Sequence, residues 1–256
     1  MPQDRILYAD TAAWRVERVL KPAGLLHAGS PVYQVATRRW VFPVSGVSEF
    51  HLEGRQVLLD GLTVVALPTG LPYRIHDWQA AERSHMVVSM QPGSAPTGAG
   101  HALAWSLPPR ALWQLRLHWR ALAQGREQAA GPVLGQGVPS GNSAMAHAAV
   151  ARARRFMATR TAAADGMGWS LHDVADAACC SYFHLARLFR THTGLGLHAY
   201  REQLRLAVAL QRLDEGEGDL AALAHDLGYS SQSHLGTAFR SAIGVTPAQA
   251  RQALRG

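Results

Sequence analysis

The sequence contains little lysine, little cysteine and no long apolar run. Lys21 is the only lysine among 25 basic residues. The two cysteines, Cys179 and Cys180, are adjacent, and neighbouring cysteines rarely form a disulfide, so a small disulfide-stabilised secreted domain is excluded and reduced thiols are expected. No stretch approaches the roughly 18 apolar residues of a membrane helix, and the N-terminal segment lacks the features of a secretory signal. We therefore expect a cytoplasmic protein with no membrane partner.

The overall composition is that of an ordinary globular protein. The chain has 256 residues, of which 48% are hydrophobic and 17% charged, and this length accommodates two compact domains. The formal net charge is +7, carried almost entirely by arginine, which is compatible with an anionic partner such as nucleic acid.

The first part of the chain has the pattern of short antiparallel strands. Between residues 14 and 90, short apolar runs are separated by glycine, proline and charged residues. Glu53-Gly54 and Asp60-Gly61 are turn signals between such runs. The pattern predicts a β-sandwich or a small β-barrel.

A helix and a linker are expected next. Residues 111–127 carry Leu112, Leu115, Trp119 and Leu122 at spacings of three and four, which indicates one amphipathic helix. Its apolar side could form a dimer contact or pack on its own barrel. Residues 131–142 contain four glycines and two prolines and are interpreted as a linker. The expected domains are 1–130, the linker 131–142 and a helical domain 143–256.

The helical domain contains an internal repeat. Six residues recur 50 positions later, namely Ser181, His184, Leu185, Phe189, Arg190 and Gly194 as Ser231, His234, Leu235, Phe239, Arg240 and Gly244. Upstream of these residues the separation between the two copies is 49 positions, which matches Leu171 with Leu220 and Ala175 with Ala224. The second copy therefore has one more residue in its turn.

Each copy is predicted to be a helix-turn-helix. Ser170, with Asp173 three residues later, and Asp219 are expected helix N-caps of the two short first helices. A tight turn, a second helix of about ten residues and a terminal glycine follow in each copy. In such units the second helix enters the major groove of DNA.

The region 145–253 resembles the AraC/XylS family of transcription regulators. The resemblance is carried by SLHDVADAACCSYFHLARLFRTHTGLGLHAYREQLRLAVAL and by DLAALAHDLGYSSQSHLGTAFRSAIGVTPAQAR. The second block matches the family signature in order and spacing at Ala224, Gly228, Tyr229, Ser233, Phe239, Gly244, Pro247 and Arg251.

The resemblance implies an α+β protein. It has an N-terminal cupin-like antiparallel β-barrel or sandwich that senses an effector and dimerises, and a C-terminal all-α domain whose two helix-turn-helix units are joined by a long helix at about His198–Asp214. Such a protein binds promoter DNA and most often activates transcription by positioning RNA polymerase. The implied partners are double-stranded DNA, RNA polymerase, a small-molecule effector and a second copy of the chain.

The residues expected to face DNA follow from the apolar faces of the second helices. With Leu185, Leu188 and Phe189 inward in the first unit, Arg187 is placed to read guanine as a bidentate donor. In the second unit Gln232 is the expected adenine reader. The full expected set is Tyr182, Phe183, Ala186, Arg187, Arg190, Ser231, Gln232, Ser233, Thr237 and Arg240.

Two departures from the family pattern stand out. Gly236 and Thr237 occupy a stretch where many relatives carry a basic residue. Cys179 and Cys180 replace the usual glycine and apolar residue of the first turn, at a cost of about 1 kcal/mol if Cys179 needs a positive φ. The pair is either a thiol switch or, the interpretation we favour, two small buried side chains. His184 and His234, equivalent in the two copies, either contact phosphate or pack beside the helix cap.

The β-rich part supplies candidates for an effector pocket. The aromatic residues Trp40, Phe50, Tyr73 and Trp78 either line such a pocket or belong to the core. A cupin-type metal site would use His27, His51, His76 and His85, but no HxH pair is followed by a nearby glutamate, so neither a metal nor another cofactor is expected.

Two alternatives to a ligand-responsive regulator remain at this point. One is a cupin-type metal-dependent enzyme with a helical assembly domain, although we expect the protein not to be an enzyme. The other is a constitutive DNA-binding protein whose β-domain only dimerises.

Overall fold

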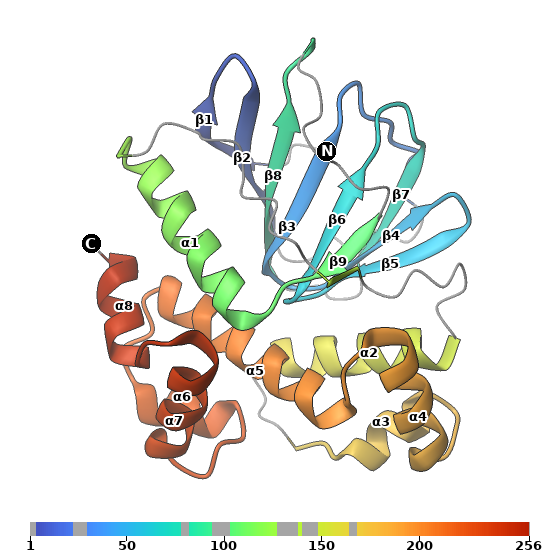
Figure 1. The fold of residues 1–256 in the computed structure, drawn as a ribbon, viewed down its shortest axis with the longest axis vertical. Coiled ribbons are helices and arrows are strands. Elements are labelled where there is room, and N and C mark those ends of the chain that lie inside the picture. Colours follow the sequence, from blue (N-terminus) through green and yellow to red (C-terminus); the bar gives the residue numbers. More distant parts are fainter. Residues whose placement is uncertain are drawn as a thin grey trace. The chain divides into compact units, whose positions relative to one another are not determined.

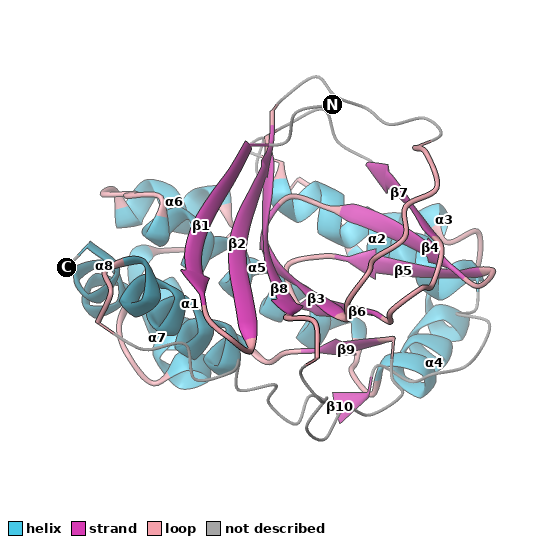
Figure 2. Ribbon diagram, turned by 90° about the horizontal axis from the view of Figure 1, so that it is seen from above, coloured by secondary structure: helices cyan, strands magenta, loops and turns pink. Residues whose placement is uncertain are grey.

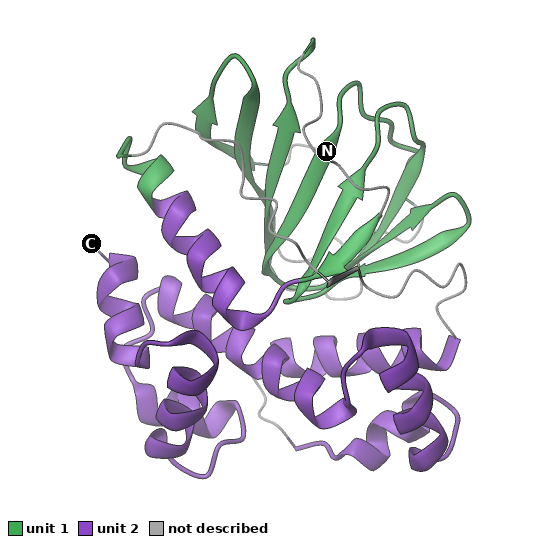
Figure 3. Ribbon diagram, viewed as in Figure 1, with its two compact units in different colours: residues 1–106, 121–146 green, residues 107–120, 147–256 purple. Residues whose placement is uncertain are grey.

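The computed structural model describes residues 4–22, 30–77, 82–93, 103–126, 138–139, 148–163 and 168–255. The chain divides into two compact units, coloured separately in Figure 3: residues 1–106 with 121–146, and residues 107–120 with 147–256. The first unit is built of antiparallel strands and the second of helices (Figure 1), so the predicted α+β fold is confirmed. In the described ranges, no helix is both long and apolar enough to cross a membrane.

The first unit consists of two antiparallel sheets (Figure 2). The larger has the strand order β1-β2-β8-β3-β6-β9-β10 and the smaller the order β5-β4-β7. The strands are β1 (Asp4–Asp10), β2 (Trp14–Lys21), β3 (Arg39–Ser45), β4 (Ser48–Leu52), β5 (Arg55–Leu59), β6 (Thr63–Leu67), β7 (Tyr73–Asp77), β8 (Arg83–Met90), β9 (Ala104–Ser106) and β10 (Val138–Pro139).

The predicted turns connect these strands. Glu53 and Gly54 join β4 to β5 with φ angles of 48° and 73°, and two successive positive φ angles are typical of the type I′ hairpin turn. After β5 the carboxylate of Asp60 accepts a hydrogen bond of 3.0 Å from the backbone of Leu62, closing the second predicted turn.

The hydrophobic core of this unit lies between the two sheets. Phe50, Leu52 and Tyr73 enter it from the smaller sheet, and Val41, Val65 and Leu67 enter from the larger one, all of them buried. Burial of their apolar surface is the main stabilising contribution to this unit.

A buried charged cluster also joins the two sheets. The Asp77 carboxylate on β7 lies 3.3 Å from the Lys21 ammonium on β2 and 3.2 Å from the Arg83 guanidinium on β8. It also accepts a 2.6 Å hydrogen bond from the hydroxyl of Ser48. Burial alone would raise the pKa of Asp77, but Lys21, Ser48 and Arg83 together lower it. A Cβ at Gly46, whose φ is 77°, would collide with the Arg83 side chain.

The second unit contains the predicted tandem repeat (Figure 1). The long helix α5 joins α3 and α4 on one side to α6 and α7 on the other, and it agrees with the predicted long helix to within one residue. Of the predicted linker, only Val138–Pro139 is described; it pairs with β9. The helices are α1 (Pro109–Ala123), α2 (Ala148–Ala162), α3 (Leu171–Ala177), α4 (Tyr182–Thr193), α5 (Leu197–Asp214), α6 (Leu220–Asp226), α7 (Gln232–Ile243) and α8 (Pro247–Arg255).

The amphipathic helix predicted at 111–127 is α1, and its described ion pairs are with the helical unit. Residues up to Arg120 group with the helical unit. The guanidinium of Arg116 lies 2.7 Å from the carboxylate of Asp214 at the end of α5, and Arg120 lies 3.5 Å from the same carboxylate. Because Arg116 and Asp214 are 98 positions apart, local periodicity could not show this pairing.

Candidate nucleic-acid interface

The second helices of the two repeats, α4 and α7, begin and end in the same way. Each has 12 residues and starts after a serine, Ser181 or Ser231, whose hydroxyl accepts a hydrogen bond from the backbone of the histidine three residues later. Each ends at a glycine with a left-handed backbone, with φ of 74° at Gly194 and 98° at Gly244. The predicted terminal glycines of both helices are therefore confirmed, and the serine N-caps are an addition that the structure shows.

The two helices also bury equivalent faces. Leu185 and Phe189 of α4 are fully buried, as are Leu235 and Phe239 of α7. Leu188, which we expected on the inward face, is only partly buried. The opposite faces are mostly exposed, so the 50-residue repeat in sequence is also a repeat in packing.

The short first helices begin at the predicted caps. Ser170 and Asp173 form a reciprocal capping box at the start of α3. Asp219 accepts hydrogen bonds of 2.9 Å from the backbones of both Ala221 and Ala222 at the start of α6. These caps satisfy backbone donors that the helices themselves leave without partners.

The turn of the first helix-turn-helix contains a strained residue. Cys179 has a φ of 56°, and Gly228, at the equivalent place in the second helix-turn-helix, has a φ of 71°. The expectation of two small buried side chains is wrong for Cys179, which is exposed, whereas Cys180 is partly buried. Both are free thiols.

Cys179→Gly should raise the free energy of unfolding by roughly 1 kcal/mol, because glycine adopts a positive φ without the steric cost of a Cβ. The matched control is Gly228→Ala, which should lower it by a similar amount. Urea unfolding of the two variants and the parent chain measures both effects. A Cys179→Gly chain no more stable than the parent would show that this turn is unstrained.

Each turn is held to a neighbouring helix. The guanidinium of Arg152 on α2 donates a 2.6 Å hydrogen bond to the carbonyl of Ala178 in the first turn. In the second turn, the Tyr229 hydroxyl donates to Glu202 of α5 at 2.8 Å, and Arg205 donates to the Gly228 carbonyl at 2.9 Å. These contacts fix the angle at which α4 and α7 leave their turns.

On α4, three of the five expected DNA-facing residues are exposed. They are Phe183, with 84% of its surface exposed, Arg187 and Arg190. Tyr182 is partly buried and stacks on the His172 ring at 5.4 Å between centroids, and Ala186 is also partly buried.

On α7, all five expected residues are exposed, but two have hydroxyls already engaged in the helix. Ser231 caps the helix through His234, and Thr237 donates to the Ser233 carbonyl at 3.1 Å. Gln232, Ser233 and Arg240 keep their polar side-chain groups available.

His234 packs beside the cap, one of the two alternatives considered for the equivalent histidines. Its ring nitrogen lies 3.0 Å from the Ser230 hydroxyl, and its ring meets that of Tyr229 edge-on at 5.2 Å. His184 is exposed at the corresponding position of α4.

The arginines of the helical unit fall into two groups. Several bind other parts of the unit: Arg212 pairs with Asp226 and Glu217 at 2.6 Å each, and Arg152 and Arg205 hold the turns. The second group lies on the outer faces of the repeat. Among the described residues its members make no side-chain hydrogen bond or ion pair: Arg187, Arg190 and Arg240.

The first unit contains a cavity of about 140 Å³ that includes two of the four expected pocket residues. Phe50 and Tyr73 line it. Trp40 is buried on the other face of β3, next to Trp14, because side chains alternate along a strand and its neighbours Arg39 and Val41 face the cavity. Trp78 lies outside the described residues.

The cavity wall also contains Arg39, His85 and Tyr33, which were not among the expected pocket residues. The signal for Arg39 in the sequence was weak, since β3 is largely buried on both faces and shows no alternation of polar and apolar residues. His85 was considered only as a metal ligand.

The histidines considered for a metal site fall in two places where the structure describes them. His51 lies 2.7 Å from Glu49, and His76 is the strand partner of Glu49 across β4 and β7. His85 lines the cavity, and His27 is outside the described residues. Within the described ranges, no group of three or more His, Cys, Asp or Glu side chains could hold a metal ion.

Comparison with known proteins identifies the helical repeat. A family model described as a helix-turn-helix domain matches residues 174–253. A Streptomyces antibioticus protein whose name describes it as an AraC-like transcription regulator is 29% identical over 213 residues, 83% of this chain and 64% of its own length. A Streptomyces lividans protein with the same description is 37% identical over 84 residues, 33% of this chain and 28% of its own.

The chain thus spans less than two thirds of the length of either relative. The crystal structure of ToxT from Vibrio cholerae aligns with a TM-score of 0.39 and 11% identity, over 96% of this chain and all of that one. The match at 174–253 falls on the tandem repeat derived above, and the resemblance noted in the sequence is confirmed. Residues 174–253 match a helix-turn-helix domain, and the chain is similar to AraC-like transcription regulators, with a β-rich unit preceding that domain.

Proposed function

We propose that this chain binds double-stranded promoter DNA through the outer faces of α4 and α7 and regulates transcription in response to a small molecule bound by its β-rich unit. The observation that carries the proposal is the set of exposed, unpaired side chains on the outer faces of both helices. Arg187 and Arg190 lie on α4, Gln232 and Arg240 lie on α7, and Arg190 and Arg240 are equivalent in the repeat. Arginine and glutamine are the side chains that read guanine and adenine edges in the major groove.

The charge of the two helices supports binding to a polyanion. Neither 182–193 nor 232–243 contains an aspartate or glutamate. A surface whose only ionised groups are positive attracts the phosphate backbone and releases its counterions. The exposed ring of Phe183 adds an apolar group that can contact a thymine methyl.

The spacing of the two helix-turn-helix units also fits a duplex. The helix α5 between them has 18 residues, about 27 Å at 1.5 Å per residue. Figure 1 shows α4 and α7 near the two ends of α5, on the same side of it in this view. Successive major grooves on one face of DNA are about 34 Å apart, so one chain is able to reach two of them.

We assign effector sensing and dimerisation to the β-rich unit, and recruitment of RNA polymerase to the complete regulator. The cavity supports the first assignment, since it is enclosed by both sheets and lined by polar as well as apolar side chains. Activation by contact with RNA polymerase rests on the family resemblance. Similarity to AraC-like transcription regulators argues against the alternative of a cupin-type enzyme.

Selection of duplexes from a random library by the purified chain tests DNA binding. We expect enrichment of a site with two short preferred elements whose centres lie about 10 base pairs apart, with affinity that falls steeply as salt rises. A purified, folded chain that enriches no sequence would contradict the proposal.

A further inference from the structure

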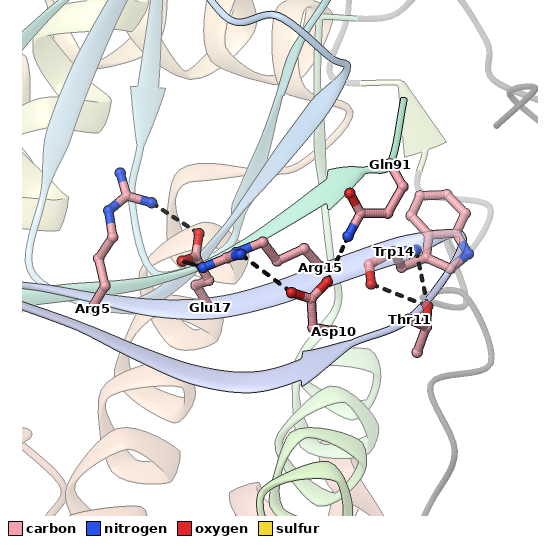
Figure 4. A network of polar contacts seen from close by, with 7 residues as sticks. All are labelled: Arg5, Asp10, Thr11, Trp14, Arg15, Glu17 and Gln91. Carbon is pink, nitrogen blue, oxygen red and sulfur yellow. Dashed lines mark hydrogen bonds and ion pairs between the residues drawn. The ribbon is translucent and has the colours of Figure 1, made fainter. Parts of the chain in front are cut away.

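The cavity of the β-rich unit has a cationic wall. Arg5, Lys21 and Arg39 line it, and no aspartate or glutamate does. Two of these cations are paired at its edge: Lys21 with Asp77, and Arg5 with Glu17 at 3.0 Å (Figure 4).

The third cation, Arg39, has no such partner. Nowhere in the described ranges does its guanidinium form an ion pair or a hydrogen bond, and its Nε atom is buried. Its positive charge opposes the effect of burial on the pKa of Tyr73, which remains raised overall. A partly buried, unpaired guanidinium beside a cavity is a binding group for an anion.

His85 is a second group without a partner. Only 8% of its surface is exposed, it lines the cavity, and its ring makes no hydrogen bond to any other described residue. Burial, reinforced by the charge of Lys21, lowers the pKa of His85 to about 3, so the ring is neutral and carries one N–H donor. Because His85 lines the cavity, a ligand oxygen there could accept a hydrogen bond from this N–H.

The rest of the wall is apolar and aromatic. Val41, Phe50 and Leu67 line it together with the rings of Tyr33 and Tyr73, which lie 5.5 Å apart between centroids. The volume of about 140 Å³ is close to that of an apolar cavity, about 150 Å³, known to hold one benzene molecule. The cavity thus suits a ligand with a body no larger than one six-membered ring or a short chain.

We propose that the effector of this protein is a small monocarboxylate with a compact apolar body. Its carboxylate binds the Arg39 guanidinium and the N–H of His85, and its body lies against Phe50 and the tyrosine rings. A neutral effector would leave the charge of Arg39 uncompensated, and a larger one would exceed the cavity. This inference rests on the proposed sensing function.

Calorimetric titration of the full chain with two acids and their amides tests the charge requirement. The probes are benzoate and hexanoate, with benzamide and hexanamide as neutral partners of the same shape. We expect at least one acid to bind with one-to-one stoichiometry and at least about tenfold more tightly than its amide, since hydrogen bonds between charged groups are the strong ones. Equal affinity of acid and amide, or no binding of either acid at millimolar concentration, overturns the proposal.

Two variants test the binding groups. Arg39→Gln should weaken binding of the acid at least about tenfold and leave the amide unaffected. The matched control is Arg38→Gln, because Arg38 is the preceding residue and its guanidinium lies over the Trp40 ring, at 5.5 Å from the ring centroid. Tyr73→Phe, which removes only a hydroxyl and keeps the ring against the ligand body, should leave binding of the acid nearly unchanged. Loss of acid binding in Arg38→Gln but not in Arg39→Gln contradicts the assignment.

The same chains distinguish failure of this inference from failure of the regulator proposal. Fluorescence anisotropy on a selected duplex, with and without the bound acid, reports DNA affinity separately from ligand binding. A chain that binds its duplex but neither acid overturns the ligand class and leaves DNA recognition intact. A chain that binds an acid but no duplex contradicts the proposed DNA recognition and leaves the ligand class intact.

Discussion

Asp77→Asn should lower the free energy of unfolding by about 3 to 5 kcal/mol, the usual cost of removing one partner from a buried ion pair. The Asp77 side chain is fully buried and lies between Lys21 and Arg83, which are themselves 4% and 1% exposed. Lys21 can respond by losing its proton, since burial already lowers its pKa. The guanidinium of Arg83 cannot, so its charge would stay in the interior without this carboxylate.

Asp10→Asn is the matched control for this variant. Asp10 pairs with Arg15 at 3.2 Å on the surface of the same unit (Figure 4), and their side chains are 40% and 44% exposed. Exposed pairs contribute about 0 to 1 kcal/mol. Urea unfolding at neutral pH compares both variants with the parent. If Asp77→Asn costs no more than Asp10→Asn, the buried cluster does not hold the two sheets together.

Arg187→Ala and Gln232→Ala should each weaken binding to a selected duplex by about 1 to 3 kcal/mol, or roughly 5- to 150-fold. Each removes a side chain that is exposed and unpaired on the outer face of its helix. Because the two residues belong to different helix-turn-helix units, each variant should relax preference at one element only, and the two elements should lie about 10 base pairs apart. Anisotropy titrations on duplexes mutated one base pair at a time measure this.

Arg110→Ala controls for the loss of a positive charge. Arg110 is exposed near the start of α1, outside both helix-turn-helix units, and its loss should leave base preference unchanged. An unchanged isotherm for Arg187→Ala would show that this arginine reads no base. Relaxation at the same base pair by both variants would contradict reading by two separate helices.

The helical unit was predictable because its signals are local. Caps, terminal glycines and apolar spacings act within a few residues, so Ser170 with Asp173, Gly194 and the Leu185 to Phe189 face could be identified from the sequence alone. The 50-residue repeat then supplied an independent check on each assignment. Cys179 shows the limit of this reasoning: the positive φ was anticipated, but the exposed thiol was not.

The cavity was only half predictable because its members are brought together by strand pairing. Phe50 and Tyr73 were candidates because they are aromatic. Arg39 and His85 are 46 positions apart in the sequence and lie close together only because β3 pairs with β8. Where both faces of a strand are buried, alternation does not distinguish the face that lines a cavity from the other. Trp40 and Arg39 are neighbours in sequence and lie on opposite faces of β3.

By itself, the sequence determined the strand-rich and helical parts of the chain, the duplicated helix-turn-helix and the outward faces of its second helices, since each depends on interactions between near neighbours. Only the tertiary structure decided that Asp77 binds Lys21 and Arg83 in the interior, that Arg116 of α1 pairs with Asp214, and that an unpaired arginine and histidine meet at one cavity. Those contacts join residues far apart in the chain, and their existence depends on strand register and helix packing.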